Sequence, residues 1–272
     1  MKRVVSIFET AYGPEHPDVA IPLNNLAQLL QDTNRLAEAE PLMRRALAID
    51  EASLGPEHPH VARDLNNLAI LLQATNRLAE AEPLMRRALA IDEASYGPEH
   101  PDVATDLNSL AQLLQDTNRL AEAEPLMERV VSIFEKAYGP DHPQVAIGLN
   151  NVAALLQATN RLAEAEPLYR RALAINETNY GPEHHEVAKS LNNLATVFQA
   201  TNRLAESELL MRRVVRNFCL FQARTGHAHP QRETVIRNYV LLLLDMKVPE
   251  PEIIRRVEEL EAEAREAAAG GQ

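Results

Sequence analysis

The chain has 272 residues, of which 46% are hydrophobic and 4% aromatic, and its formal net charge is −12 at pH 7. An acidic chain repels nucleic acid and anionic lipid, so neither is expected as a partner. With no tryptophan, the core must be built from Leu, Ala, Val, Ile and Met, the residues that pack helices.

The single cysteine, Cys219, excludes an internal disulfide and lies in an apolar helical stretch, where a buried structural thiol is expected. No segment reads as a signal peptide, and no apolar run approaches the ~20 residues that a membrane-spanning helix needs. These features predict a cytoplasmic protein that has no membrane partner.

A Gly-Pro dipeptide recurs with a period of 42 residues, at Gly13, Gly55, Gly97, Gly139 and Gly181. Self-similarity at this length is typical of a solenoid, in which each unit buries its apolar face on its neighbours. Residues 1–245 are therefore expected to form one tandem array, with an N-terminal half-repeat and about five units, the last of them degenerate.

The chain opens on residues 1–16, which match residues 127–142 and are predicted to be a second helix without its own first helix. A first helix is expected to start near Pro17, because its apolar residues recur at the spacing of one helix face: Leu23, Leu26, Ala27, Leu30. The other units repeat this pattern.

Residues 33–35 can form only a tight turn, in which Asn34 can adopt a left-handed conformation, so the next helix must run antiparallel to the first. That second helix is predicted over residues 36–53, until Gly55, expected in the left-handed C-terminal conformation, and the proline after it end it.

The end of the chain departs from the period. Residues 236–244 are predicted to be a last first helix, in which Asn238 takes the place of Asn25. Residues 246–272 are expected to hold a charged capping helix, from about residue 252 to 268, and a frayed tail with Gly270 and Gly271.

Taken together, these residues resemble the tetratricopeptide repeat, with Leu and Ala where its large aromatic and glycine usually stand. The 42-residue form, with its Leu-Asn-Asn-Leu-Ala and Gly-Pro-Glu-His-Pro blocks, looks like the kinesin light chain repeat domain and its bacterial relatives. The resemblance covers residues 1 to about 215 and implies an all-α fold: an α-solenoid of antiparallel helix pairs in a right-handed superhelix, with first helices on the concave surface.

Amides form a ladder along the first helices. In the resembling family, first-helix asparagines contact bound peptide, and Asn25, Asn67, Asn151 and Asn193 stand at the matching place, whereas Ser109 departs from it. Each asparagine could instead lock neighbouring helices together. The predicted peptide-binding residues are Asn24, Asn25, Gln28, Arg63, Asn66, Asn67, Asn108, Ser109, Gln112, Asn150, Asn151, Lys189, Asn192 and Asn193.

Positions that differ between near-identical units are expected to choose the partner. One such position holds Ile21, Arg63, Thr105, Ile147 and Lys189, and another holds Gln28, Ile70, Gln112, Ala154 and Thr196. Only Arg63 and Lys189 are basic at the first position, and they lie three units apart, so a clamp for a C-terminal carboxylate is not expected.

No pattern in the chain favours catalysis, a metal or a cofactor. The repeated histidines lack a third ligand at zinc-site spacing and read as packed or capping residues. The repeated glutamates suit the first turns of helices, and Arg44 can pair with Glu40 one turn away. We therefore predict a non-enzymatic scaffold that binds a protein or an extended peptide; the alternatives are a self-assembling array, with end-to-end association through Val4, Val5 and Phe8, and a recruitment module of a larger signalling protein.

Overall fold

A computed structural model describes residues 1–270, which contain thirteen α-helices and no strand. The predicted frayed tail lies at the edge of this range, and Gly271 falls outside the described residues. The chain divides into two compact units, Met1–Gly139 and a second unit that begins at Pro140, and each is described by itself. None of the described helices is both long and apolar enough to cross a membrane.

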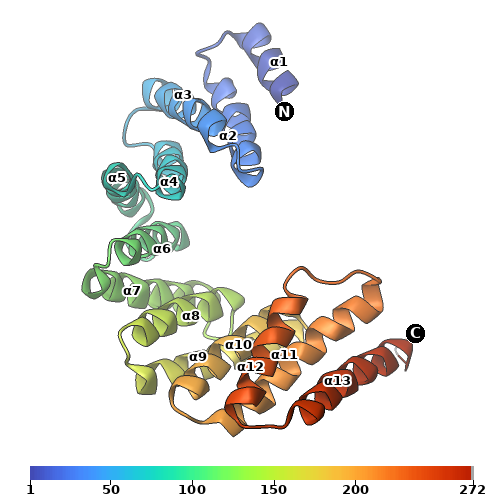
Figure 1. Cartoon of the computed structure of the whole chain (residues 1–272). Helices are drawn as coiled ribbons and strands as arrows, with labels where there is room; N and C mark the ends of the chain where they lie inside the picture. The colour runs from blue at the N-terminus through green and yellow to red at the C-terminus, as the bar shows by residue number, and fades with distance from the viewer. Residues whose placement is uncertain (271–272) are drawn as a thin grey trace. The chain divides into compact units, whose positions relative to one another are not determined.

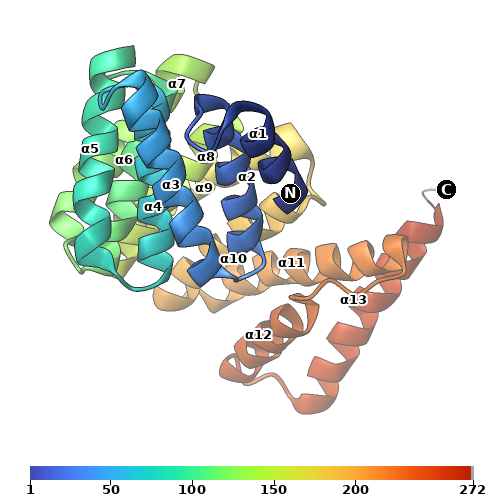
Figure 2. The ribbon, with the colours of Figure 1, turned by 90° about the horizontal axis from the view of Figure 1, so that it is seen from above.

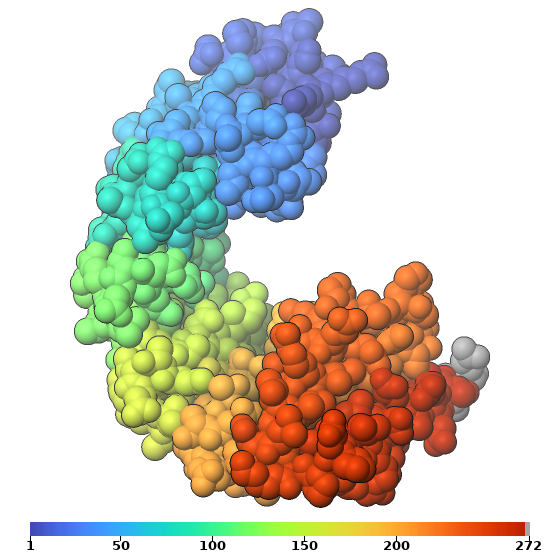
Figure 3. All heavy atoms as spheres, viewed as in Figure 1, coloured from blue at the N-terminus to red at the C-terminus, as the bar shows by residue number. Residues whose placement is uncertain are grey.

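The first unit consists of a leading helix and three antiparallel helix pairs. Its helices are α1 (Lys2–Tyr12), α2 (Pro17–Asp32), α3 (Leu36–Leu54), α4 (Pro59–Ala74), α5 (Leu78–Tyr96), α6 (Pro101–Asp116) and α7 (Leu120–Tyr138). The first helices α2, α4 and α6 form one layer and the second helices α3, α5 and α7 the other (Figure 1). Side chains fill the spaces that separate the ribbons of neighbouring pairs in this unit (Figure 3).

The second unit continues the pairing and ends differently. Its helices are α8 (Pro143–Ala158), α9 (Leu162–Tyr180), α10 (His185–Ala200), α11 (Leu204–Thr225), α12 (Arg232–Asp245) and α13 (Glu250–Gly270). The helix α11 packs on α10, and both α12 and α13 lie beside α11 (Figure 2). The all-α solenoid expected from the period is thus confirmed, with second helices that end within a residue or two of the predicted position.

The apolar stripe of each first helix forms the core. In α4, Leu65, Leu68 and Leu72 are each 1% exposed, and Val61 and Ala69 are fully buried. Second helices meet this stripe with small residues and a methionine or tyrosine: Ala81, Met85, Ala88 and Ile91 in α5 are all buried. Because small and large residues alternate, the two helices of a pair approach closely along their whole length.

Asparagine forms the turn inside each pair, as predicted. Asn34, Asn76, Asn118, Asn160 and Asn202 have positive φ angles between 57° and 60°. Asparagine tolerates this left-handed conformation better than other non-glycine residues. The next residue returns a backbone hydrogen bond to the first helix, as from Arg35 N to Leu30 O at 2.8 Å.

The prediction for the linker glycines is wrong in one detail. Gly55 has φ 92° and ψ 154°, which is not the left-handed helical conformation, where ψ would be near +47°. A proline follows, and its ring restricts the preceding residue to the extended range of ψ. Gly226, which is followed by histidine, does adopt the left-handed conformation, with φ 72° and ψ 0°.

Histidine caps the N-terminus of each first helix from α2 to α10. The Nδ1 atom of His58 accepts a hydrogen bond from the backbone N–H of His60 at 3.1 Å, and His16, His100, His142 and His184 make the equivalent bond at 3.2 Å. The imidazole thus caps the helix in place of the serine or aspartate side chain that usually accepts this hydrogen bond. These repeated histidines therefore serve the helix ends.

Ion pairs link successive second helices. Glu40 of α3 accepts from Arg44 one turn away at 2.9 Å, as predicted, and from Arg77 at the start of α5 at 2.8 Å. The hydrogen bond from Arg77, followed by that from Arg44, lowers the pKa of Glu40 against an opposing effect of burial. Glu82 makes the same contacts with Arg86 and Arg119, each at 2.7 Å. Such exposed pairs add little stability individually but fix the register between pairs.

Candidate functional site

The predicted binding residues all lie on first helices, at different depths. Asn25, Gln28, Arg63, Gln112 and Lys189 are exposed, and Asn66 is buried. The others are half-buried: Asn24, Asn67, Asn108, Ser109, Asn150, Asn151, Asn192 and Asn193. We call this set the first-helix surface. In the first two asparagine pairs the second member is the more exposed of the two: Asn25 is more exposed than Asn24, and Asn67 more than Asn66.

Asn24 locks two helices together, which is the structural alternative considered for the amides. Its Nδ2 atom in α2 donates to Asp64 Oδ1 in α4 at 2.8 Å. Asn66, the next repeat's equivalent, is 8% exposed, and its Oδ1 atom accepts no hydrogen bond within the described part of the chain. Asn24 Oδ1 likewise accepts no hydrogen bond among the described residues, so the carbonyl oxygen at this position is unpaired in both repeats.

Exposed amides on the first-helix surface are held only by their own helix. Gln28 donates to Asp32 at 3.0 Å and Gln112 to Asp116 at 3.2 Å, both one turn away. Such exposed pairs are weak and can be exchanged for bonds to a ligand. Ser109 instead turns its hydroxyl onto the carbonyl of Thr105 at 3.1 Å.

Three of the glutamines at the ends of the first helices serve the packing of the helix pairs, whereas Gln73 of α4 donates to Asp116 of α6 at 2.5 Å. Gln115 donates to Met127 Sδ at 3.3 Å, Gln157 accepts from the Tyr169 hydroxyl at 3.2 Å, and Gln199 donates to Ser207 Oγ at 3.1 Å. Each bond joins the first helix of a pair to its second helix. These amides are therefore engaged inside the helix pairs, away from the first-helix surface.

One cavity in the second unit brings several predicted residues together. Lys189, Asn192 and Asn193 of α10 line a hollow of about 250 Å³ with Gln231 and Asn238 of the α12 region. Lys189 Nζ is bound to Glu186 at 2.8 Å. Sequence reasoning noted that Asn238 takes the place of Asn25 but did not include it among the binding residues; the structure places it beside Asn192 and Asn193.

A second cavity, in the first unit, joins Arg63, Asn66 and Thr105 to aspartates that the sequence did not single out. It measures about 290 Å³ and is lined by Pro59, His60, Arg63, Asn66, Asp92, Tyr96, Asp102, Thr105 and Asp106. Asp92 is 7% exposed and Asp106 4% exposed. Aspartate in an apolar helix stripe was the sequence feature that could have revealed them, since a buried carboxylate is costly unless it is paired.

Burial changes the acidity of these carboxyl groups. Removal from water, followed by the charge of Asp92, raises the pKa of Asp106 to about 8. Burial is also the main reason why the pKa of Asp92 is raised and that of Asp64 reaches about 7. For Asp64, the nearby Arg63 guanidinium opposes this effect, with its Nη2 atom 3.3 Å from Oδ1. Near neutral pH the Asp92–Asp106 pair therefore retains a proton.

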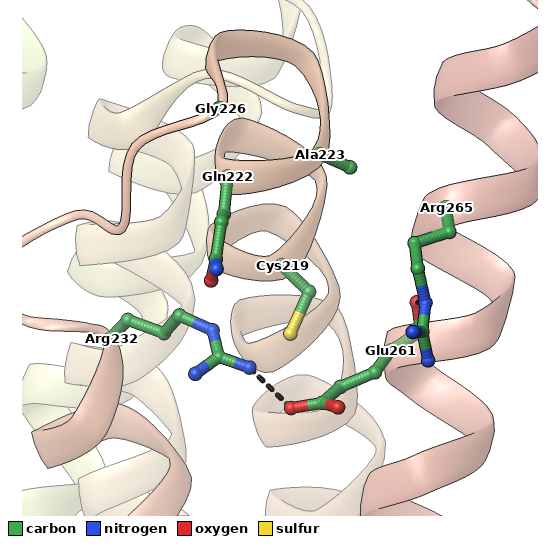
Figure 4. Close-up of a pocket in the computed structure, with 7 residues that line it drawn as sticks. All are labelled: Cys219, Gln222, Ala223, Gly226, Arg232, Glu261 and Arg265. Carbon is green, nitrogen blue, oxygen red and sulfur yellow. Dashed lines mark hydrogen bonds and ion pairs between the residues drawn. The ribbon is translucent and has the colours of Figure 1, made fainter.

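A third cavity, of about 250 Å³, lies where α11, α12 and α13 meet. Arg232 of α12 points across it to form an ion pair with Glu261 of α13, and the Cys219 side chain of α11 lies between them (Figure 4). Cys219 is 5% exposed, which confirms the buried thiol, and burial raises its pKa. A thiol that stays protonated is a poor nucleophile, so these groups serve to hold α13 in place.

The helix pairs, their repeated caps and the amide-bearing surface define an α-helical repeat protein. A family model for the tetratricopeptide repeat matches residues 1–52, 23–94, 65–136, 107–178 and 145–219. The chain belongs to the tetratricopeptide repeat family, whose members commonly act as scaffolds for interactions between proteins. A comparison with curated proteins gives no match.

Solved structures similar to this chain include kinesin light chain-like repeats. A Podosopora anserina protein described as a kinesin light chain with nearly identical TPR-like repeats is 28% identical over 78% of this chain and 99% of its own, with a TM-score of 0.67. BtubC (BKLC) from P. vanneervenii is 19% identical and covers 93% of both chains, with a TM-score of 0.62. At that identity the second likeness shows the fold alone.

Proposed function

We propose that the chain is a non-enzymatic scaffold that binds an extended peptide segment of a partner protein along the first-helix surface. The observation that carries this proposal is the regular series of amides on that surface, which repeats with the helix pairs. An amide offers a donor and an acceptor, so it can pair with a peptide backbone whatever the peptide sequence. The differing residues beside the amides would then choose the partner.

The burial pattern supports this assignment. Asn25 is exposed and Asn67 is half-buried on successive first helices of one unit. The constant apolar core beneath them explains why the units are nearly identical, whereas it does not explain why Arg63 and Thr105 differ at one surface position. Variation confined to the surface is what a partner-selecting face requires.

The test is a double substitution within the first unit. Asn25→Ala with Asn67→Ala should weaken binding of peptides selected from a displayed library on the wild-type chain by at least tenfold, because two backbone contacts of roughly 1 kcal/mol each are lost. Isothermal titration calorimetry measures the affinity. Circular dichroism checks that helix content is unchanged.

Ser95→Ala with Ser132→Ala is the matched control, since both serines are exposed on second helices. That variant should bind like the wild-type chain. Equal loss of affinity in both double variants would place the peptide elsewhere, and failure to select any peptide would reject the proposal.

A further inference from the structure

Three buried acceptor atoms without donors belong to residues that line the cavity of the first unit. They are Asn66 Oδ1, Asp92 Oδ1 and Asp106 Oδ2, and each lacks a hydrogen-bond partner within the described residues. The three residues are 8%, 7% and 4% exposed. A buried acceptor without a donor is destabilising, and three around one hollow form a site that is complementary to a group rich in donors.

At the equivalent places elsewhere, the carboxylates either face a guanidinium or are replaced by uncharged residues, although Asn24 Oδ1 and Asp64 Oδ2 also lack a hydrogen-bond partner among the described residues. One repeat earlier, Asp64 and Asp50 have the Arg63 guanidinium at 3.3 Å and 3.9 Å, and Asp64 also accepts from Asn24. In the second unit, the equivalents are uncharged: Asn176 Nδ2 donates to Ser190 Oγ at 2.9 Å. The Asp92–Asp106 pair of the first unit has neither an arginine beside it nor uncharged residues in place of the carboxylates.

The reason is the residue beside Asp106. Thr105 stands where the preceding repeat has Arg63, so the Asp92–Asp106 pair has no cation of its own. Tyr96, His60 and Asp102 line the same cavity, and Asp102 adds a further negative charge. The Arg63 guanidinium lines the same cavity but is paired with Asp64, and the charge of His100 also acts on Asp92.

We propose that this cavity binds the ammonium group of a lysine side chain in an extended peptide; the proposal rests on the peptide-binding function inferred above. An ammonium group has three N–H donors and no acceptor, and it matches the three unpaired oxygens while supplying the missing positive charge. Tyr96 and Pro59 line the same cavity, and their apolar surface suits the methylene stem of lysine.

The proton held by the aspartate pair adds a pH dependence. An entering ammonium displaces that proton, since both would neutralise the same carboxyl groups, and a lysine side chain stays charged up to about pH 10. Binding should therefore strengthen between pH 6 and pH 8.5. The other charged or titratable groups that face the pair are His60, His100, Asp102, Tyr96 and Arg63.

The direct probe is n-butylammonium, which reproduces the end of a lysine side chain. In the wild-type chain, ¹³C NMR of the aspartate carboxyl carbons should show saturable shifts at Asp92 and Asp106. Asp50 and Asp64 serve as the internal control and should not respond. Tetramethylammonium at the same ionic strength lacks N–H donors and should leave all four signals in place.

Thr105→Arg introduces the arginine that the preceding repeat has at this position, Arg63, and should reduce the affinity for n-butylammonium at least tenfold. The double variant Asp92→Asn with Asp106→Ser copies the second unit's uncharged pair and should abolish the response, with helix content checked by circular dichroism. For a lysine-containing peptide selected on the wild-type chain, replacing the lysine by norleucine should weaken binding by the same factor of at least ten. This loss should be seen only in chains that keep Thr105.

Equal responses to the two ammonium ions, or a response that survives Thr105→Arg, would overturn the lysine site. The aspartate pair would then hold only its shared proton. This result is separable from failure of the peptide-binding proposal. Peptide binding that depends on Asn25 and Asn67 without any n-butylammonium response rejects the lysine site alone. A saturable n-butylammonium response without peptide binding rejects the wider function alone.

Discussion

At some positions of this repeat, the residue type depends on the backbone conformation required there as much as on side-chain contacts. Gly97 has φ 87° and ψ 156°, a conformation that is almost exclusive to glycine, whereas Gly226 has φ 72° and ψ 0°, which asparagine also adopts. An added Cβ atom would meet no atom within 4 Å at either place. Any cost of substitution there must come from the backbone itself.

We therefore expect Gly97→Asn to destabilise the chain by about 1–3 kcal/mol. Gly226→Asn should cost less than about 1 kcal/mol, because asparagine tolerates the left-handed conformation. The shift in urea unfolding midpoint measures both changes. Equal shifts would show that the proline after Gly97 does not impose the special conformation.

Among single residues, the sequence could predict those whose conformation depends on near neighbours. Asn34 and its equivalents were expected to turn the chain, and they do so with φ near 60°. The partners of Asn24 and Asp106 could not be predicted, because they lie in other helices. Asn24 bonds to a residue 40 positions away, and nothing in its local sequence distinguishes it from Asn66.

At the scale of the element, each first helix depends on a titratable cap. His184 Nδ1 accepts from Glu186 N at 3.2 Å, and the imidazole stacks on Tyr180 with ring centres 4.6 Å apart. An imidazole can accept this bond only when it is neutral. Burial, followed by the charge of His185, lowers the pKa of His184, so the folded chain binds this proton less readily than the unfolded chain.

The stabilising effect of this cap should depend on pH. It is fully present above about pH 6.5, the usual histidine value, and is lost as the pH falls through the lowered pKa. His184→Ala should cost about 1 kcal/mol at pH 7.5 and much less at pH 5. Urea unfolding at both pH values measures the difference.

His184→Asn is the matched variant, because asparagine accepts the same bond without titrating. It should unfold like the wild-type chain at pH 7.5 and more stably than the wild-type chain at pH 5. A constant difference between wild type and His184→Ala at both pH values would rule out the Nδ1 cap as the cause.

At the scale of the whole molecule, the helix pairs within each unit contact mainly their neighbours in sequence. The last helix, α13, departs from the pairing and lies against α11, where Ile253, Leu260 and Ala264 are at most 4% exposed. We propose that α13 caps the array, as the charged composition of residues 246–272 predicted. At the other end, the prediction of end-to-end association through Val4, Val5 and Phe8 is wrong for Val5, which is 8% exposed because it packs inside the first unit. Phe8 is half-buried, and Val4 is 38% exposed.

Removal of residues 249–272 should therefore unfold only part of the chain. Hydrogen exchange followed by mass spectrometry should show lost protection in α11 and α12, whereas α2 to α6 keep theirs, because stability in such arrays is a sum of local terms. Removal of Gly271 and Gln272 alone is the control and should leave exchange unchanged. A uniform loss of protection would show that the array unfolds as one cooperative block.

The sequence by itself determined the helices, their antiparallel pairing and the family, because a fixed period carries the apolar stripe, the asparagine turn and the Gly-Pro end in every unit. These features depend on residues within one or two turns of each other. Only the tertiary structure decided which amides are engaged between helices, and that Asp92, Asp106 and Asn66 line one cavity and each keep one acceptor atom without a donor. Those contacts join different helices at separations near the repeat length. The effect of having Arg63 in one repeat and Thr105 in the next therefore depends on carboxyl groups that the tertiary structure brings near them.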